Sequence, residues 1–295
     1  MRFKKKIIHG APVRKTPRPL GKIYSVIPNC YFTKLYILNI ISIPYSRLRG
    51  VTMRKTKNAL ATEGLAWPTL LPGTLVKRYN RFIADITLTD GRTISAHCPN
   101  SGSMLACCEP GRPVYVSFHD NPKRKLKYTW ELIEMPGSIV GINTQVPNRL
   151  VATSIEADLV PDLNGYHSIS REVKTSGKTR LDILLRNGEK DRCYVEIKNC
   201  TLVEDEVARF PDAVTSRGLK HLLELESLVS EGFRCVIFYV IQRMDATIFH
   251  PADHIDPAYG KELRRALKHG VEILVYDTQI DLKAIRLNRK IPYRL

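Results

Sequence analysis

Two β-prone runs joined by a tight-turn dipeptide constrain the fold of this chain more than any other feature of its sequence. The runs cover Arg180 to Leu185 and Cys193 to Lys198, and Asn187-Gly188 lies in the polar connection between them. Asn-Gly is the dipeptide most typical of two-residue hairpin turns, because both positions require a positive φ. The sequence therefore predicts an antiparallel hairpin.

The second run carries an acid and an amine on one face. Side chains alternate faces along a strand, so Glu196 and Lys198 point one way, while Val195 and Ile197 point into apolar packing. A hairpin centred near Glu189 would place Asp182 opposite Glu196, close enough for both carboxylates to share one divalent cation.

This pattern resembles the signature of the PD-(D/E)XK nucleases, although Leu181 replaces the proline before the first acid. In such sites the carboxylates hold Mg2+ or Mn2+ against a phosphodiester, and the lysine orients water or meets the developing charge. Asp182, Glu196 and Lys198 are therefore the predicted catalytic residues, with Asp182 and Glu196 as metal ligands. The alternative is a solvated charge pair on an exposed strand.

A further carboxylate is often recruited from the preceding strand or helix. Glu172 is the predicted catalytic candidate and Glu156 a second one; the alternative is that both are surface glutamates.

The charge of the chain is unevenly distributed. The net charge is +17, but residues 1–62 hold 14 Lys and Arg and no Asp or Glu, which leaves 32 basic against 29 acidic residues in the remainder. The basic excess therefore belongs mainly to the first segment and says little about partners of the folded body.

Residues 1–62 superficially resemble a transit peptide or a signal sequence, but no clear small-residue cleavage site follows. Their longest run free of charge and proline, Leu35 to Ile43, is too short for a bilayer span of about 20 residues. We expect a disordered or spurious extension, with Met53 as an alternative start, and no membrane association.

The seven cysteines are odd in number and form no Cys-x-x-Cys pair, which favours a reduced, cytoplasmic protein. His97-Cys98 and Cys107-Cys108 lack the chelating spacing of a zinc site, so we interpret these cysteines as small core residues.

Short strands with Gly and Pro punctuation follow from residue 70. They are expected at Gly73 to Lys77, Phe82 to Leu88, Thr93 to Cys98, Pro113 to Phe118 and Lys127 to Ile133. Five closely spaced strands predict a small barrel of the OB type over residues 68–147, with a short extra strand at Ile139 to Asn143.

Barrels of this type bind nucleic acid through basic and aromatic groups, and two clusters of the barrel hold both kinds. The predicted nucleic-acid contacts there are Arg78, Arg81, Lys123, Arg124, Lys125 and Lys127. The alternative for the second cluster is a solvated hairpin tip.

The remaining residues, 148–295, alternate between helical and strand patterns. Helices are expected at Asn148 to Val160, Thr215 to Ser230 and Pro257 to His269, and strands at Ser168 to Lys174, Cys235 to Ile241 and Val271 to Tyr276 around the hairpin. The two long helices are expected to bury Leu150, Val151, Ile155 and Leu159, and Leu219, Leu222, Leu223 and Leu225. This order predicts a mixed sheet with helices on both faces, as in restriction endonucleases. The overall class is α/β, in two domains.

Several stretches together resemble the sugar fermentation stimulation protein A family. They are Leu75 to Asp85, His97 to Gly102, Arg124 to Leu132, Asn143 to Leu150, Tyr194 to Asn199, Phe210 to Val214 and Arg217 to Leu222. The resemblance covers the chain from about Leu70 onward and implies an OB-type barrel, a nuclease-like domain, DNA binding with little sequence preference, and a regulatory association with maltose metabolism.

The resemblance also places the acidic motif of the family on Asp182, Glu196 and Lys198, and Lys220 with His221 on the following helix. Arg217, Lys220 and His221 lie one helical turn apart and are expected to face a phosphate together, with an exposed helix face as the alternative. Arg180 shares the strand face of Asp182 and completes the predicted nucleic-acid contacts; the alternative is that it pairs with a nearby carboxylate.

We therefore expect a DNA-binding protein with a metal-dependent nuclease-like site. The alternatives are a regulator that keeps the nuclease fold without turnover and, with least support, a metabolic enzyme, for which no Gly-rich phosphate loop or nucleophile elbow is present. The oligomeric state and the preferred form of nucleic acid do not follow from the sequence.

Overall fold

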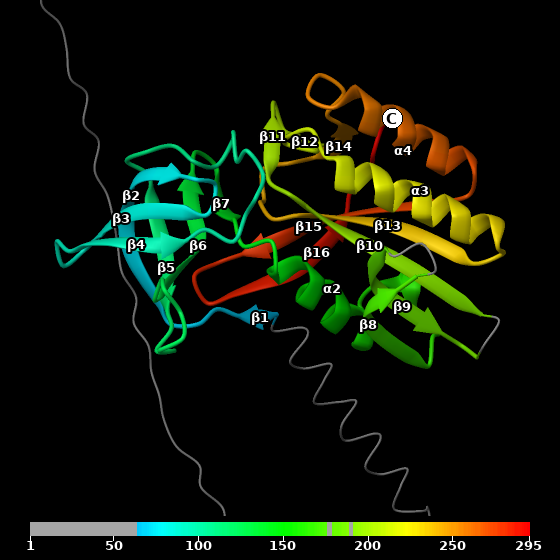
Figure 1. The fold of residues 1–295 in the computed structure, drawn as a ribbon, viewed down its shortest axis with the longest axis horizontal. Coiled ribbons are helices and arrows are strands. Elements are labelled where there is room, and N and C mark those ends of the chain that lie inside the picture. Colours follow the sequence, from blue (N-terminus) through cyan, green and yellow to red (C-terminus); the bar gives the residue numbers. More distant parts are fainter. Residues whose placement is uncertain (1–63, 176–178, 189–190) are drawn as a thin grey trace, which may run out of the picture. The chain divides into compact units, whose positions relative to one another are not determined.

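The computed structural model describes residues 64–175, 179–188 and 191–295. The prediction for residues 1–62 lies outside the described residues, as does Glu189, the assumed centre of the hairpin. Figure 1 shows a β-rich domain followed along the chain by a sheet with helices on both faces.

The first domain is the expected barrel. Its strands are β2 (Leu70–Tyr79), β3 (Ile83–Leu88), β4 (Thr93–His97), β5 (Pro113–Phe118), β6 (Tyr128–Met135) and β7 (Ser138–Gly141). They pair in the order β4-β3-β2-β5-β6-β7, and a parallel pairing of β4 with β6 closes the barrel. The fully buried Trp130, Ile86 and Met104 belong to its core.

The second domain contains the expected mixed sheet. Its helices are α2 (Val146–Glu156), α3 (Ser216–Ser230) and α4 (Pro257–Lys268), with a 3-10 turn at Pro161–Leu163. The strands are β8 (Ser168–Lys174), β9 (Arg180–Arg186), β10 (Arg192–Cys200), β13 (Arg234–Ile241), β15 (Glu272–Ile280) and β16 (Ala284–Lys290). The hairpin β9–β10 is antiparallel, whereas β10, β13 and β15 are parallel, so both crossovers run through the helices α3 and α4.

Two pairings were not expected from the sequence. The two-residue strand β1 (Leu65–Ala66) precedes the barrel but pairs with β16, so it forms one edge of the seven-stranded sheet β1-β16-β15-β13-β10-β9-β8. A separate three-stranded sheet joins β11 (Leu202–Glu204), β12 (Val207–Phe210) and β14 (Ile248–Pro251).

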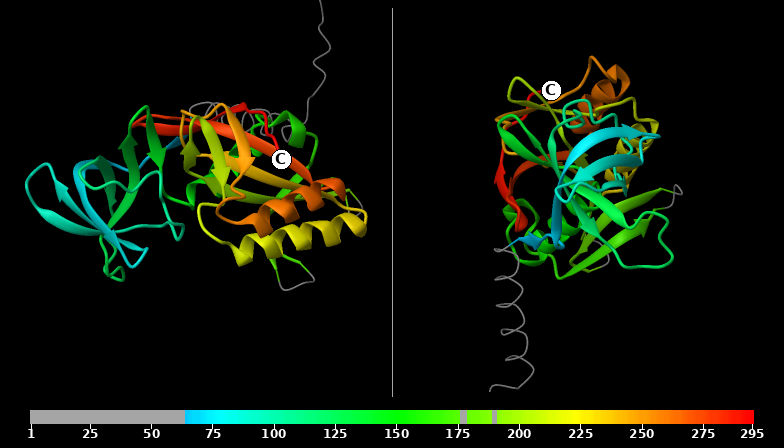
Figure 2. Two further views of the ribbon diagram at one scale, coloured as in Figure 1. Left: turned by 90° about the horizontal axis from the view of Figure 1, so that it is seen from above. Right: turned by 90° about the vertical axis from the view of Figure 1, so that its left-hand side faces the viewer.

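Separate apolar clusters lie on the two faces of the large sheet. Figures 1 and 2 show α3 and α4 together on one face and α2 on the other. Leu222 and Leu225 of α3 are buried in the first cluster, and Leu150, Val151 and Ile155 of α2 in the second. Burial was wrongly predicted for Leu159, which follows the end of α2, and for Leu223, which lies on the outer side of α3; both side chains are exposed.

The start of α3 is fixed by two side chains. Thr215 Oγ1 accepts a hydrogen bond from the backbone N–H of Gly218 at 3.0 Å, which caps the helix. Asp256 caps α4 through the N–H of Tyr259 and also accepts from the N–H of Thr215 at 2.9 Å. One buried carboxylate thus joins the first turns of both helices.

The described cysteines behave as core residues. All six are free, five of them are buried, and Cys108 is half-buried. No helix in the described part of the chain is long and apolar enough to cross a membrane.

Candidate active site between strands β9 and β10 and helix α3

The hairpin adopts the register that the sequence predicts. Arg192 pairs with Arg186, and the ladder continues to Val195 opposite Ile183. Continued by one pair, this register places Glu196 opposite Asp182. Beyond Val195 the strands diverge, and the backbone N–H of Ile197 donates to Asp182 Oδ2 at 2.8 Å instead.

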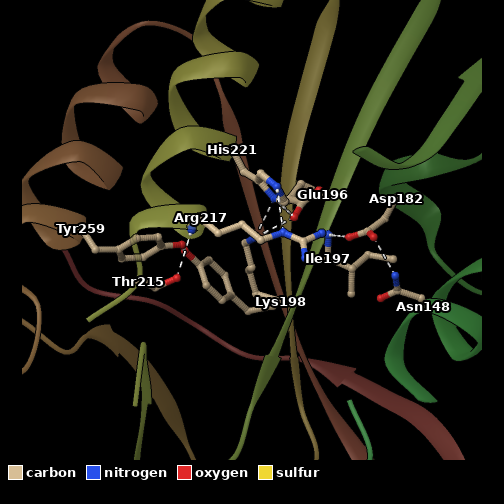
Figure 3. Close-up of polar contacts among 11 residues, drawn as sticks. Asn148, Asp182, Glu196, Ile197, Lys198, Thr215, Arg217, His221 and Tyr259 are labelled. Carbon is tan, nitrogen blue, oxygen red and sulfur yellow. Dashed lines mark hydrogen bonds and ion pairs between the residues drawn. The ribbon is translucent and has the colours of Figure 1, made fainter. Parts of the chain in front are cut away.

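Asp182 is held from two elements. Besides the N–H of Ile197, the side-chain amide of Asn148 on α2 donates to Oδ1 at 2.6 Å (Figure 3). Burial, reinforced by the negative charge of Glu196, raises the pKa of Asp182 to about 7. A carboxylate whose ionisation is this unfavourable gains from a nearby cation.

Glu196, Lys198 and His221 form one buried cluster. Lys198 Nζ lies 2.6 Å from Glu196 Oε1 and 3.0 Å from His221 Nδ1, and that ring nitrogen also contacts Glu196 Oε1 (Figure 3). Burial opposes ionisation of Glu196, but the Lys198 charge and the His221 hydrogen bond prevail and lower its pKa. Glu196 is thus the ionised member of the carboxylate pair.

Both ring nitrogens of His221 are engaged. Arg217 Nε donates to Nε2 at 3.4 Å, while Glu196 Oε1 and Lys198 Nζ both lie against Nδ1. His221 is only 5% exposed, so the alternative of an exposed helix face does not hold for His221, whereas Arg217 and Lys220 are exposed.

The two carboxylates fit a hard divalent cation. Glu196 Oε2 is buried without a hydrogen-bond partner among the described residues, whereas Oε1 is engaged. The described residues contain no group of three or more His, Cys, Asp or Glu side chains suited to a metal ion. Zinc usually takes three or four protein ligands, but Mg2+ binds through one or two carboxylates and keeps several waters. The two carboxylates therefore suit a hard divalent cation.

These side chains open into a cleft of about 410 Å3. Its polar lining includes three arginines from three different segments, together with a loop of the barrel. The residues that line the cleft include Arg81, Asn100, Ser101, Gly102, Asn148, Asp182, Glu196, Lys198, Asn199, Thr201, Arg209, Asp212, Arg217 and His221.

The barrel loop, residues 100–104, is hydrogen-bonded to the opposite side of the cleft. The hydroxyl of Ser103 donates to the carbonyl of Asp212, and the N–H of Met104 donates to the Asp212 carboxylate at 2.9 Å. A Cβ added at Gly102 would lie only 2.5 Å from Asp212 Oδ1, so the close approach requires glycine. The loop is thus part of the cleft wall.

A second hollow, of about 680 Å3, adjoins the first through Arg217 and His221, which line both. Arg180, Lys220 and Glu172 line it as well. Glu172 has a left-handed backbone (φ 54°) and its carboxylate pairs with Arg180 at 3.6 Å. The structure brings the basic residues together here, but it does not bring Glu172 into the cleft that holds Asp182 and Glu196.

The remaining predicted contacts of the barrel do not line this cleft. The Arg78 guanidinium donates to the carbonyls of Arg81, Asn100, Gly102 and Ser103, and so holds the barrel loop in place. Arg124 donates to Thr129 and lines a separate hollow with His97, His119 and Arg149. Lys127 bonds the Asn121 carbonyl, and Lys123 and Lys125 are exposed.

Reasoning from the sequence missed several cleft residues, among them Asn148, Arg209 and Asp212. Asn148 and Asp212 lie within stretches that carry the family resemblance, but neither has a spacing that points to the acidic motif. Their roles depend on contacts across 34 residues for Asn148 and Asp182, and 108 residues for Met104 and Asp212.

Comparison with known proteins assigns both domains. The family model for the SfsA N-terminal OB domain matches residues 76–142, and that for the sugar fermentation stimulation protein RE domain matches residues 145–284. A sugar fermentation stimulation protein homolog of Geotalea uraniireducens is 50% identical over 226 residues, which cover 77% of this chain and 97% of the relative. The chain belongs to the sugar fermentation stimulation protein family.

Other members of the family agree with this assignment. The homolog of Geobacter sulfurreducens is 52% identical over 223 residues, or 76% of this chain and 95% of the relative. The solved structure of Pyrococcus furiosus SfsA in complex with Ca2+ matches with a TM-score of 0.72 at 29% identity, covering 78% of this chain and 98% of that chain. The family resemblance expected from the sequence is confirmed, as is the OB barrel followed by a mixed α/β sheet domain.

Proposed function

We propose that this protein is a DNA-binding phosphodiesterase whose site uses a divalent cation, Mg2+ or Mn2+, and reads phosphates rather than bases. The observation that carries the proposal is the convergence of Asp182, Glu196 and Lys198 from two neighbouring strands on one cleft. The orphaned Oε2 of Glu196 and the raised pKa of Asp182 both favour a bound cation. The Ca2+ complex of the Pyrococcus furiosus relative also supports it.

Each group has a role in hydrolysis of a phosphodiester. A bound divalent cation would neutralise a phosphate oxygen and acidify a water. Lys198, which His221 and Glu196 hold in place, is positioned to orient the attacking water or to meet the charge that develops on phosphorus. The water oxygen forms a bond to phosphorus, the bond from phosphorus to one sugar oxygen breaks, and a proton passes to that leaving oxygen.

The basic residues around the two hollows suit the backbone of DNA. Arg81, Arg209 and Arg217 line the cleft, and Arg180 and Lys220 line the adjoining hollow. Arginine and lysine contacts to phosphate carry no sequence information, so we expect sequence-independent binding that weakens steeply with salt.

A specific contact favours a second candidate function. Lys198 and His221 both occupy Oε1 of Glu196, which leaves only Oε2 for a cation. A site closed in this way suits a regulator that binds DNA without cleaving it, and the family name links the relatives to sugar fermentation. The regulator would act in maltose metabolism. Under either function we expect a cytoplasmic location, which the free cysteines support.

Nuclease assays with the purified chain distinguish the two functions. With Mg2+ or Mn2+ present, we expect labelled DNA to be cleaved, and Glu196→Gln to remove cleavage while DNA binding remains. Metal-dependent binding without any product would favour the regulator. Cleavage that survives Glu196→Gln would show that the active site has been assigned to the wrong residues.

A further inference from the structure

The reacting groups are almost fully buried. The side chain of Glu196 is 3% exposed and that of Lys198 10% exposed, and both line a cleft of about 410 Å3. This volume is within the range of pockets that enclose single small ligands, about 300–1,000 Å3. A phosphate can reach Glu196 only as part of a chain thin enough to enter.

The barrel loop narrows the approach from one side. Asn100, Ser101 and Gly102 line the cleft opposite the segment from Pro211 to Arg217. The bonds from Ser103 and Met104 to Asp212 hold the two sides together. A duplex would have to bring its complementary strand into the same space, whereas one unpaired strand can bend into it.

An exposed aromatic ring follows Arg81 in the turn between β2 and β3 of the barrel. Phe82 is the next residue after Arg81, which lines the cleft, and its side chain is 50% exposed. Bases stack on such rings only when they are unpaired and free of their neighbours, as in the OB barrels that bind single strands. An exposed phenylalanine next to an arginine suits one nucleotide, with the base on the ring and the phosphate at the guanidinium.

The adjoining hollow continues the path. It shares Arg217 and His221 with the cleft and adds Arg180 and Lys220, so basic groups follow one another from the barrel loop past the carboxylates to strand β9. A single backbone laid along this line would meet several cationic side chains in turn.

We infer that the cleft takes one unpaired nucleic-acid strand, such as a single-stranded segment or a tail on a duplex, and excludes intact duplex. The inference rests on the proposed function and names its substrate class. The strand passes between the barrel loop and the start of α3, with a base on Phe82 and a phosphate at the carboxylates.

The test compares three forms of one labelled oligonucleotide of mixed sequence: alone, with its full complement, and with a shorter complement that leaves a tail. With Mg2+ or Mn2+, we expect the single strand and the tail to be cleaved at least about ten-fold faster than the intact duplex, with cuts confined to the tail. Equal or faster cleavage of the intact duplex would overturn the inference and leave the proposed function standing.

Binding gives a readout that does not depend on turnover. In fluorescence anisotropy with Ca2+, Phe82→Ala should weaken single-strand binding by about 5- to 150-fold, which corresponds to the stacking of one base. Tyr293→Ala removes an exposed aromatic ring whose chain neighbours, unlike Arg81 beside Phe82, line neither hollow, and it should leave binding unchanged. Equal losses in the two variants would overturn the inference.

The binding assay also separates the inference from the proposed function. If no form of the oligonucleotide is cleaved, the enzymatic proposal fails, and tighter single-strand binding that depends on Phe82 still supports the inference. Duplex binding as tight as single-strand binding, in wild type and in Phe82→Ala, contradicts it.

Discussion

Asp182 Oδ2 accepts a hydrogen bond of 2.8 Å from the backbone N–H of Ile197, the residue between the acid and the amine of the neighbouring strand. This bond fixes the carboxylate of one strand against the backbone that carries Glu196 and Lys198. It also ties the titration of Asp182 to the stability of the hairpin, from which the first prediction follows.

Asp182→Asn should stabilise the protein in the absence of metal. The pKa of Asp182 rises from 3.8 to about 7 on folding, so the folded state holds a proton that the unfolded state releases in this interval. Stability therefore falls as pH rises from about 4 to 7, by up to about 4 kcal/mol. Thermal unfolding in EDTA should show this fall in wild type and not in Asp182→Asn, and Mg2+ should restore stability in wild type alone. Parallel pH profiles for the two proteins would contradict the prediction.

Lys198→Met should destabilise the fold as well as remove activity. It leaves Glu196 buried without its cationic partner, and breaking a buried pair costs about 3–5 kcal/mol. Adding Glu196→Gln should recover part of this loss in urea unfolding. The exposed Lys125 supplies the control, since Lys125→Met should change stability by less than about 0.5 kcal/mol. A stable, inactive Lys198→Met would mean that the pair contributes little to folding.

Arg217→Gln should weaken DNA binding by removing a contact to phosphate. Arg217 is exposed and lines both hollows, so its removal should lower the slope of log affinity against log salt by about one. Arg92→Gln, which removes an exposed arginine outside both hollows, should leave the slope unchanged. Titrations at several salt concentrations measure the slope, and the same slope in both variants would argue against a phosphate contact at Arg217.

Arg78→Gln should lower stability rather than the salt slope. The Arg78 guanidinium donates to the carbonyl of Arg81 and to three carbonyls of the loop after β4. Loss of these hydrogen bonds is expected to cost about 1.5–3 kcal/mol of stability. Arg81→Gln should have the opposite profile, with weaker DNA binding and unchanged unfolding, because Arg81 lines the cleft and is exposed. A lower salt slope with normal stability in Arg78→Gln would return Arg78 to the predicted DNA contacts.

Asn148→Ala should reduce metal affinity without unfolding α2. The amide of Asn148 orients Asp182, and loss of such a supporting contact typically lowers metal affinity or activity by about 10- to 100-fold. Isothermal titration with Mn2+ measures the affinity directly. Asn148→Asp tests the contact separately, because a second carboxylate there should repel Asp182. Unchanged Mn2+ affinity in Asn148→Ala would remove this residue from the site.

The sequence was sufficient for the elements with strong periodicity and for the hairpin. Strand β8 was predicted with its observed bounds, and the assumed hairpin centre near Glu189 corresponds to the observed register of Val195 opposite Ile183. These features depend on local turn chemistry and on alternation within a few residues, which a single sequence contains.

The missed features depend on contacts that span the chain. The pairing of Leu65 with Ile285 has no local signal, and a three-residue strand such as β11 is too short for a period to be read. The carbonyls that Arg78 meets were not predicted either, because three of them lie more than 20 residues away in the sequence.

The strand β1 limits how the chain can be shortened. Leu65 and Ala66 cover the outer edge of β16 by antiparallel pairing, although the whole barrel separates them from the rest of that sheet in the sequence. A truncation that begins at the barrel would uncover the N–H and C=O groups of β16, and an open edge of this kind recruits strands from other molecules. The residues just before the barrel therefore shield the start of β16 in the second domain from pairing with other molecules.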